Sequence, residues 1–568
     1  MEDRIIEGGK RQRVHMTNMR EVTFEQATYA DWKTAAEGAL KGKPFESLLT
    51  KTIEGITLEP LYTKESLFEK IDGKLEEQIS TIRTMKAEGA FGVAQAAYGE
   101  NIEAFIAQAK DALQRGNQYV TVGKVAFEWT EDALKQLGAL LSAHPFRLNI
   151  EDEAVLGVFE FITNKEQVGY LQSTQPIDLP DFPNVRTFNA NVLSAHYEGA
   201  TSTQELAIAL AQAAEFMKGA SFEEVEKKFF ASFALDTHFF MAIAKIRAFR
   251  VLWKAFAKAY GVETPKPVRI ATETSLRSFS KLDVYVNLLR AGNEAFSAVI
   301  GGADLLTVHP HNILTAPTNQ SVRIARNVAL VIKEESQVTK VIDPSGGSYF
   351  IETLTHDLVK EAWAYFLKIE EAGGYEAASE MIEADLQASW SERIEKVKKR
   401  KTVLVGTNNY ADATEEIPAE TFVEVNRLAQ PFEDLRVAFK EHPMKAQILT
   451  YGELKTTKPR TDFVKGVLAT AGIVPEVTEP TTDLTEVVHM LTTTTADYVV
   501  LSATDEDTKS IVDALLAAKP EHVIFDVAGK FDTNTKWTEK GLNGYVFAGL
   551  NIYEKLTTVH ASMKEVQR

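Results

Sequence analysis

The feature of this 568-residue chain that most constrains its fold is a repeated alternation of short β-rich runs and longer amphipathic helical patterns between about residues 75 and 400. The runs predict strands at 92–97, 119–122, 146–150, 186–192, 268–274, 298–306 and near 338–342. The helical patterns predict helices at 103–115, 130–142, 203–218, 239–260, 283–296 and 321–335. Such repeated units predict parallel strands, in a closed (β/α)8 barrel or in an open sheet.

Residues 443–568 repeat the alternation with clearer turn signals. Strands are predicted at 446–451, 474–477, 497–503, 522–527 and 544–549, with helices between them such as 462–471 and 505–518. This order predicts a doubly wound, flavodoxin-like domain. Ligands of such sheets bind beyond the carboxyl ends of the strands, which here are the loops at 452–458, 502–507 and 528–532.

The remaining segments suggest how the chain is divided. Residues 1–24 are polar and aperiodic, as in a tail or a partner-binding arm, and a helix is predicted at 31–40 with Gly42 after it. An extended segment with a Glu54-Gly55 turn follows, and 376–399 predicts a long connecting helix. The predicted domains are an N-terminal arm and dimerisation segment (1–74), a barrel (75–400), a linker (401–442) and the flavodoxin-like domain (443–568).

Composition excludes several classes of function. The net charge of −18 argues against a general nucleic-acid binder and against an anionic membrane surface. The absence of cysteine excludes disulfides, thiolate nucleophiles and Cys-ligated metals. No stretch approaches the roughly 20 apolar residues of a membrane span, and the first residues lack the apolar core of a secretory signal. A soluble cytoplasmic protein is therefore expected.

His196 is the first candidate for chemistry. It follows the predicted strand 186–192, and side chains just past the carboxyl end of a barrel strand are often catalytic. A neutral imidazole there could donate a hydrogen bond to a carbonyl oxygen and stabilise charge that develops on it. The alternative is a histidine whose ring is satisfied by the local backbone.

Two further motifs carry polar groups. The turn 343–349 (DPSGGSY) could cradle a phosphate with its N–H groups, although a tight barrel turn is the simpler interpretation. His309 and His311 could reach one ion from an extended segment, but no carboxylate follows at ligand spacing, so no metal site is expected.

The helix predicted at 239–260 has the strongest local pattern. Its apolar residues recur at helical spacing, while Arg247, Arg250, Lys254 and Lys258 line the opposite side. The pattern predicts an outer barrel helix with one core face and one solvated face. A docking face for a partner subunit or an acidic ligand is the alternative.

A set of motifs in shared order resembles the methylmalonyl-CoA mutase family, and more closely its small, non-catalytic subunit. The matching stretches are 31–32, 41–45, 48–49, 52–56, 60–63, 239–240, 244–248, 252–253, 285–290, 301–304, 323–327 (RIARN), 333–336 and 343–349. The resemblance covers most of the chain. No single stretch decides it, and its specificity comes from the order over several hundred residues.

The resemblance implies a fold, a reaction and a partner. The fold is a (β/α)8 TIM barrel of the acyl-CoA mutase type followed by a flavodoxin-like cobalamin domain. The reaction is the adenosylcobalamin-dependent isomerisation of methylmalonyl-CoA to succinyl-CoA, a step of propionate metabolism. The partner is a larger catalytic subunit, with which this chain would form a heterodimer.

The sequence departs from the catalytic pattern of the family at three places. The loop Gly452, Glu453, Leu454, Lys455 lacks the Asp-x-His-x-x-Gly motif whose imidazole ligates cobalt. The stretch 81–92 lacks the Tyr-Pro-Thr-Met-Tyr-type segment, and Ala195 replaces the tyrosine that precedes the family's histidine. The resemblance therefore implies a structural chain with His196 as a vestigial candidate, no metal or cofactor site of its own, and adenosylcobalamin held by the partner.

Two other functions remain open on the sequence. One is an active acyl-CoA mutase barrel that uses cobalamin bound to a separate protein. The other is an acyl-CoA-binding scaffold in which Arg277, Lys281 and Arg290 meet phosphates, although a charged solvent face explains these residues equally simply.

Overall fold

The computed structural model describes residues 27–86, 88–173, 175, 177–531 and 535–566, so the predicted tail at 1–24 lies outside the described residues. The chain separates into two compact units, residues 1–66 and 67–568.

The first unit contains α1 (Tyr29–Ala39), a short 3₁₀ turn (Phe45–Leu48) and an antiparallel hairpin of β1 (Thr50–Lys51) and β2 (Thr57–Leu58). Thr28 caps α1 in a capping box with Asp31, and Gly55 supplies the positive φ of 79° that the hairpin turn needs. The predicted helix and turn are therefore confirmed.

The second unit contains parallel strands whose pairings form a closed cycle, here called the strand ring (residues 92–307). The two sheets have the orders β3-β12-β11-β10-β9 and β4-β5-β6-β7-β8. Two residues separate β3 from β4 and one residue separates β8 from β9, so each of these stretches pairs in both sheets. The strands are β3 (Gly92–Val93), β4 (Ala96–Ala97), β5 (Val120–Val122), β6 (Phe146–Asn149), β7 (Gly169–Gln172), β8 (Val185–Arg186), β9 (Phe188–Asn191), β10 (Phe229–Leu235), β11 (Arg269–Thr274) and β12 (Leu305–Thr307). The predicted α/β fold with parallel strands is confirmed.

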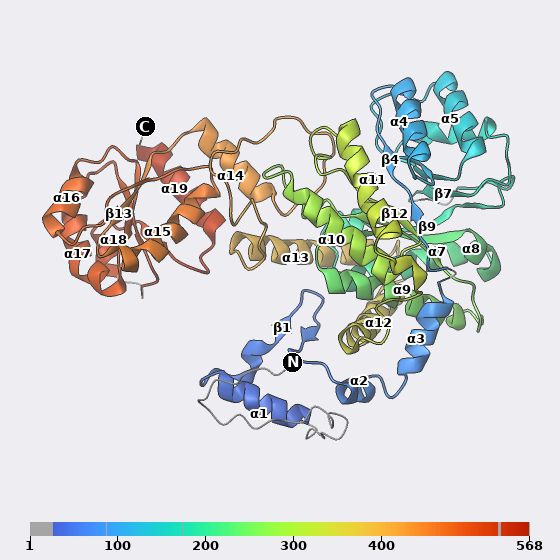
Figure 1. Ribbon diagram of the computed structural model, residues 1–568, viewed down its shortest axis with the longest axis horizontal. Coiled ribbons are helices and arrows are strands. Elements are labelled where there is room, and N and C mark those ends of the chain that lie inside the picture. Colours follow the sequence, from blue (N-terminus) through green and yellow to red (C-terminus); the bar gives the residue numbers. More distant parts are fainter. Residues whose placement is uncertain (1–26, 87, 174, 176, 532–534, 567–568) are drawn as a thin grey trace, which may run out of the picture. The chain divides into compact units, whose positions relative to one another are not determined.

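Helices follow the strands as the alternation predicts (Figure 1). They are α2 (Lys64–Lys70), α3 (Leu75–Thr84), α4 (Ile102–Gln114), α5 (Glu131–Ala143), α6 (Leu193–Tyr197), α7 (Ser202–Met217), α8 (Phe222–Lys228), α9 (Phe239–Ala259), α10 (Val286–Gly301), α11 (Asn319–Glu334), α12 (Tyr349–Glu371) and α13 (Ser379–Lys398). A 3₁₀ helix (Glu153–Glu160) follows β6.

Two predicted strands are wrong in part or whole. Residues 298–301 continue α10 until Gly302, which ends the helix at a positive φ of 95°, so the strand β12 starts only at Leu305. Residues 338–340 form a single 3₁₀ turn rather than a strand. The sequence also missed β7, β10 and the 23-residue helix α12.

The predicted solvated face of α9 is wrong for its two arginines, which are fully buried. Arg247 pairs with Asp343 and Glu352, and Arg250 donates to Asp304 at 3.0 Å. Because α7, α10 and α12 all pack on α9, the helix has little surface left for solvent. Arg247 and Arg250 are therefore paired inside the protein and do not contribute to a docking face, whereas Lys258 at the end of the helix is exposed.

The C-terminal sheet has the parallel order β14-β13-β15-β16-β17, and all its predicted strands are present. The strands are β13 (Ala446–Thr450), β14 (Glu476–Val477), β15 (Tyr498–Ser502), β16 (Ile524–Ala528) and β17 (Gly544–Val546). The helices are α14 (Gln430–Glu441), α15 (Leu454–Ala469), α16 (Leu484–Thr492), α17 (Asp505–Ala518), α18 (Thr535–Glu539) and α19 (Ile552–Val566) (Figure 1). Separate apolar clusters cover the two faces of the sheet, as a fully buried parallel sheet requires.

Candidate functional site

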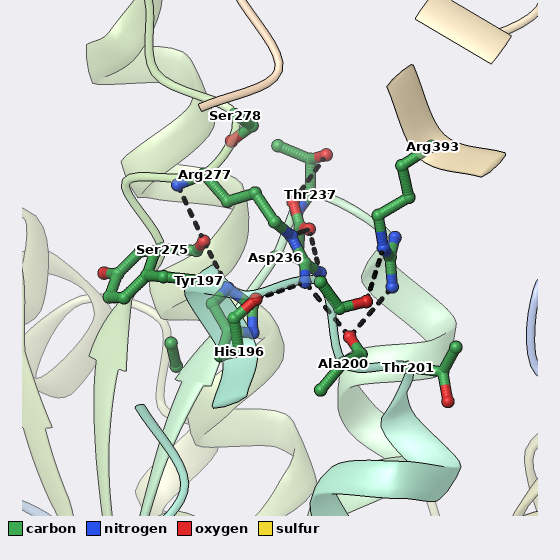
Figure 2. Close-up of polar contacts among 12 residues, drawn as sticks. His196, Tyr197, Ala200, Thr201, Asp236, Thr237, Ser275, Arg277, Ser278 and Arg393 are labelled. Carbon is green, nitrogen blue, oxygen red and sulfur yellow. Dashed lines mark hydrogen bonds and ion pairs between the residues drawn. The ribbon is translucent and has the colours of Figure 1, made fainter. Parts of the chain in front are cut away.

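His196 lies in α6, directly after β9, and its side chain is completely buried. Its Nδ1 is 2.8 Å from Glu205 Oε1. Its Nε2 is 2.7 Å from the hydroxyl of Ser275, as Figure 2 shows. Glu205 also accepts a hydrogen bond of 2.6 Å from the buried ammonium of Lys245. Both ring nitrogens are therefore engaged inside the protein.

The pKa values assign the tautomer of His196. Burial, helped by the nearby charge of Arg277, lowers the pKa of His196 to about 4, so the ring is neutral at pH 7. Burial alone would raise the pKa of Glu205, but Lys245 and His196 lower it to about 2. The carboxylate can only accept, so Nδ1–H donates to Glu205 and Nε2 accepts from Ser275.

The turn that carries His196 is clamped by two arginines (Figure 2). Arg277 donates to the carbonyls of His196 and Ala200 at 2.9 and 3.1 Å and pairs with Asp236 at 2.6 Å. Arg393 donates to the carbonyls of Gly199 and Ala200 at 3.2 and 3.0 Å. Burial would raise the pKa of Asp236, but the Arg277 charge holds it well below its usual range. The arrangement fixes a turn and leaves no ring nitrogen for a ligand.

A cavity of about 370 Å³ lies at the carboxyl ends of the ring strands. His196 does not line it, although Leu193, Ser194 and Tyr197 of the same short helix do. The polar side chains that line the cavity come from many strands: Tyr98, Thr121, Lys124, Arg147, Asn149, Glu151, Gln172, Asn191, Glu273, Thr307 and His309.

The floor of the cavity is a buried charge cluster. Arg147 donates to Thr307 at 2.8 Å, to Glu273 at 3.3 Å and to Gln172. His309 Nε2 lies 3.4 Å from the other oxygen of Glu273. Burial would raise the pKa of Glu273, but His309 and Arg147 hold it below its usual value. The Arg147 charge is thus already neutralised within the protein.

Four polar atoms of the lining are buried without a hydrogen-bond partner among the described residues. They are the Tyr98 hydroxyl, Thr121 Oγ1 and both ring nitrogens of His309, of which Nε2 has only its 3.4 Å ion-pair contact with Glu273. Unpaired buried polar groups are costly and rare, so these atoms fit a ligand or ordered water in the cavity. The sequence analysis missed four of the lining residues: Tyr98, Thr121, Arg147 and Glu273. Their side chains meet only when strands that are distant in the sequence pair. The available signal was their position at or just past the ends of strands.

The other predicted polar groups have partners within the protein. Arg277 pairs with Asp236, Lys281 donates to Thr421 at 2.9 Å, and Arg290 donates to the carbonyl of Val405 at 2.8 Å. In the turn 343–349, the Asp343 carboxylate pairs with Arg247 and Gly347 N–H donates to Glu352 at 2.9 Å. These contacts make the turn a cap on α12.

The two histidines after β12 contact different neighbours. His309 faces Glu273, while the ring of His311 stacks on Tyr285 with centroids 5.3 Å apart. No group of three or more metal-ligating side chains is found within the described part of the chain. None of the helices in that part is long and apolar enough to cross a membrane.

The predicted cofactor loop after β13 is short. Gly452, at φ 118°, donates its N–H to the Thr481 carbonyl at 2.8 Å, and Glu453 is the N-cap of α15. Leu454 and Lys455 already belong to the first turn of that helix. Three residues therefore connect the strand to the helix.

The carboxyl edge of the C-terminal sheet is covered by Arg460 of α15. Its guanidinium donates to the carbonyls of Ala503 and Ala528 at 2.6 and 3.1 Å and pairs with Asp505. The histidines of residues 443–568 are 489, 522 and 560, and none lies in the loops at this edge. The residues present do not fit a corrinoid whose cobalt is held by a histidine.

Comparisons with known proteins agree with the resemblance in the motifs. The family model for methylmalonyl-CoA mutase matches residues 178–447. The methylmalonyl-CoA mutase small subunit of Porphyromonas gingivalis is 29% identical over 598 aligned residues, which cover 94% of this chain and 97% of that protein. The chain is thus similar to methylmalonyl-CoA mutases, and to their small subunits over most of its length.

Two further relatives show how the mutase family matches this chain. The methylmalonyl-CoA mutase small subunit of Streptomyces virginiae is 26% identical and aligns with 94% of this chain and 96% of its own length. A methylmalonyl-CoA mutase of Cereibacter sphaeroides is 31% identical but aligns with only 68% of this chain and 64% of its own length. These two small subunits thus match the chain over nearly its whole length, and the resemblance stated from the sequence is confirmed.

Proposed function

We propose that this chain is the small, non-catalytic subunit of an adenosylcobalamin-dependent methylmalonyl-CoA mutase. Its larger partner would hold the cofactor and isomerise methylmalonyl-CoA to succinyl-CoA. The observation that carries the proposal is the carboxyl edge of the C-terminal sheet. That edge has no imidazole, a three-residue connection into α15 and Arg460 across the ends of β15 and β16.

The proposed architecture is that of the family. The strand ring with its helices would be the (β/α)8 barrel at 75–400, preceded by an arm and dimerisation segment at 1–74. The sheet order β14-β13-β15-β16-β17 supports a flavodoxin-like domain at 443–568, after a linker at 401–442.

The state of His196 supports a structural role for this barrel. In a catalytic site the imidazole would present one nitrogen to the substrate. Here Glu205 and Ser275 occupy both nitrogens, and Ser194 and Tyr197 take the positions toward the cavity. His196 would thus be a vestigial catalytic residue that now anchors the turn after β9.

The chain would serve its partner by docking. The chain would retain both domains of the family, although the carboxyl edge of its C-terminal sheet does not fit the cofactor. The two domains together offer a large surface on which a homologous catalytic subunit can pack. An active barrel served by a separate cobalamin protein is less well supported, because the engaged His196 offers that chemistry no free nitrogen.

One observation favours a second candidate, an acyl-CoA-binding scaffold. The cavity at the strand ends keeps buried polar atoms without a hydrogen-bond partner among the described residues, on Tyr98, Thr121 and His309. Such a scaffold would bind an acyl-CoA without converting it.

The test is mutase activity of the purified chain with adenosylcobalamin and methylmalonyl-CoA. We expect no succinyl-CoA from the chain alone and turnover once a larger homologous subunit with the histidine loop is added. Turnover by the isolated chain would contradict the proposal. Calorimetry with methylmalonyl-CoA separates the two candidates, since only the scaffold predicts heat of binding without turnover.

A further inference from the structure

A groove of about 900 Å³ is lined by residues of α4, of α11 and of the segments just before these two helices. We call it the arginine groove and define it by Gln108, Asp111 and Arg115 of α4 with Asn319, Arg323 and Arg326 of α11. Apart from Tyr98, it shares no residue with the cavity at the strand ends.

The groove carries more positive than negative charge. Three guanidinium groups line it, against the carboxylates of Asp111 and Glu100. Arg115 pairs with Asp111 at 2.6 Å, whereas Arg323 is exposed and has no hydrogen bond or ion pair within the described residues. In a chain with a net charge of −18, this is a local site that attracts anions.

Arg326 supplies an independent sign of a missing ligand. Its side chain is only 3% exposed, yet its Nε has no hydrogen-bond partner among the described residues. Its contact with Asp111, at 3.9 Å, is too long for a hydrogen bond. A buried guanidinium donor without an acceptor is costly, so the geometry calls for an acceptor in the groove.

The N-terminus of α11 adds to this field. Asn319 and Gln320, the first residues of this 16-residue helix, line the groove, and the helix dipole there favours negative charge. Gln108 links α4 to the first residue of α11, because its side-chain amide donates a hydrogen bond to Asn319 at 2.7 Å. Its amide oxygen accepts a hydrogen bond from the backbone N–H of Tyr98.

We propose that the arginine groove binds a small phosphate-bearing anion, a phosphate monoester or a diphosphate. Guanidinium groups pair with phosphate oxygens in a planar, bidentate geometry, and the groove offers one free and one half-satisfied guanidinium beside a helix N-terminus. The proposal stands apart from the mutase function, since it uses neither His196 nor the edge of the C-terminal sheet.

The experiment is isothermal calorimetry of the full chain with inorganic phosphate and with pyrophosphate at constant ionic strength. The variants are Arg323→Gln and Arg326→Gln, and the matched control is Lys509→Gln, which removes an exposed positive charge from α17. We expect pyrophosphate to bind, with affinity at least tenfold weaker in both arginine variants and unchanged in the control.

Two results would overturn the proposal. One is the absence of binding by either probe at millimolar concentration. The other is a loss of affinity that is equal in the control and in Arg323→Gln. Because Arg326 is buried, its variant risks misfolding, so circular dichroism accompanies it and the exposed Arg323 carries the decision.

Discussion

His196 stands in a hydrogen-bond chain that begins at the backbone of Arg277. The Arg277 N–H donates to Ser275 Oγ at 3.1 Å, the Ser275 hydroxyl donates to His196 Nε2, and His196 Nδ1–H donates to Glu205. Every link is buried, so each group depends on its neighbour for the hydrogen bond that water would otherwise supply. At the residue scale these hydrogen bonds determine the charge state of the imidazole. They also leave neither of its nitrogens free.

The first prediction concerns the pH dependence of stability. The pKa of His196, about 4 when folded, lies below its usual value of 6.5, so the unfolded chain takes up a proton first as the pH falls. The stability from neutral His196 is fully present above pH 6.5 and is lost between pH 6.5 and 4. Between pH 7 and pH 5 this amounts to about 2 kcal/mol.

The measurement is urea unfolding at pH 7 and pH 5 of the natural chain and of His196→Gln. We expect the difference between the two pH values to shrink in the variant, because glutamine does not titrate. An equal difference in both proteins would mean that His196 is not held neutral in the folded state.

The second prediction concerns Glu205, whose carboxylate is the acceptor shared by His196 and Lys245. Glu205→Gln would leave the ammonium of Lys245 buried without its counter-charge. Breaking a buried ion pair in this way destabilises by about 3–5 kcal/mol. Urea unfolding followed by tryptophan fluorescence measures this loss of stability, since Trp253 is buried in α9, the helix that also carries Lys245.

The control for Glu205→Gln is Glu223→Gln, which breaks an exposed pair with Lys227 one turn away on α8. Exposed pairs of this kind contribute little, so no measurable change is expected. Similar losses in the two variants would contradict the buried network as described.

Only part of the surroundings of His196 could be predicted from the sequence. The position of His196 after a strand followed from the strand pattern. Its partners did not, because Ser275 is 79 residues away and meets the ring only when β9, β10 and β11 pair side by side. The same limit applies to Arg247, whose partners Asp343 and Glu352 lie about a hundred residues further along the chain.

At the element scale, the connection from β13 into α15 decides how much room the sheet edge has. The sequence predicted a loop at 452–458 and a helix from 462, whereas α15 already begins at Leu454. Pro459 inside the helix explains the miss, because proline removes a backbone donor and is usually excluded from helix interiors. The earlier start shortens the loop to three residues.

The third prediction tests that short connection through Gly452, whose φ is 118°. An alanine there meets no close atom, since its Cβ would lie 3.4 Å from the nearest neighbour. Gly452→Ala should therefore destabilise only through backbone strain, by about 1–3 kcal/mol.

Gly466 in α15 is the matched control. A Cβ there would meet nothing within 4 Å, so Gly466→Ala should stabilise the helix by about 0.5–1 kcal/mol. Opposite signs in the two alanine variants are the expected result in urea unfolding. A neutral Gly452→Ala would show that the connection relaxes and is not a tight turn.

At the scale of the whole molecule, the alternation of strands and helices predicted the parallel sheets and the five C-terminal strands. It left the choice between a closed barrel and an open sheet undecided, since it missed β7, which is only four residues long, and the wholly buried β10, which lacks the period-2 signal of a half-buried strand. The cavity was missed for the same reason, because its lining exists only once the ring strands are side by side.

The central claim is that this chain does not itself hold the cobalt cofactor. Equilibrium dialysis of the isolated chain against hydroxocobalamin, followed by visible spectroscopy, tests it most directly. We expect no retained corrinoid and no change in its spectrum. Stoichiometric retention with the spectrum of a cobalt coordinated by a protein side chain would contradict it.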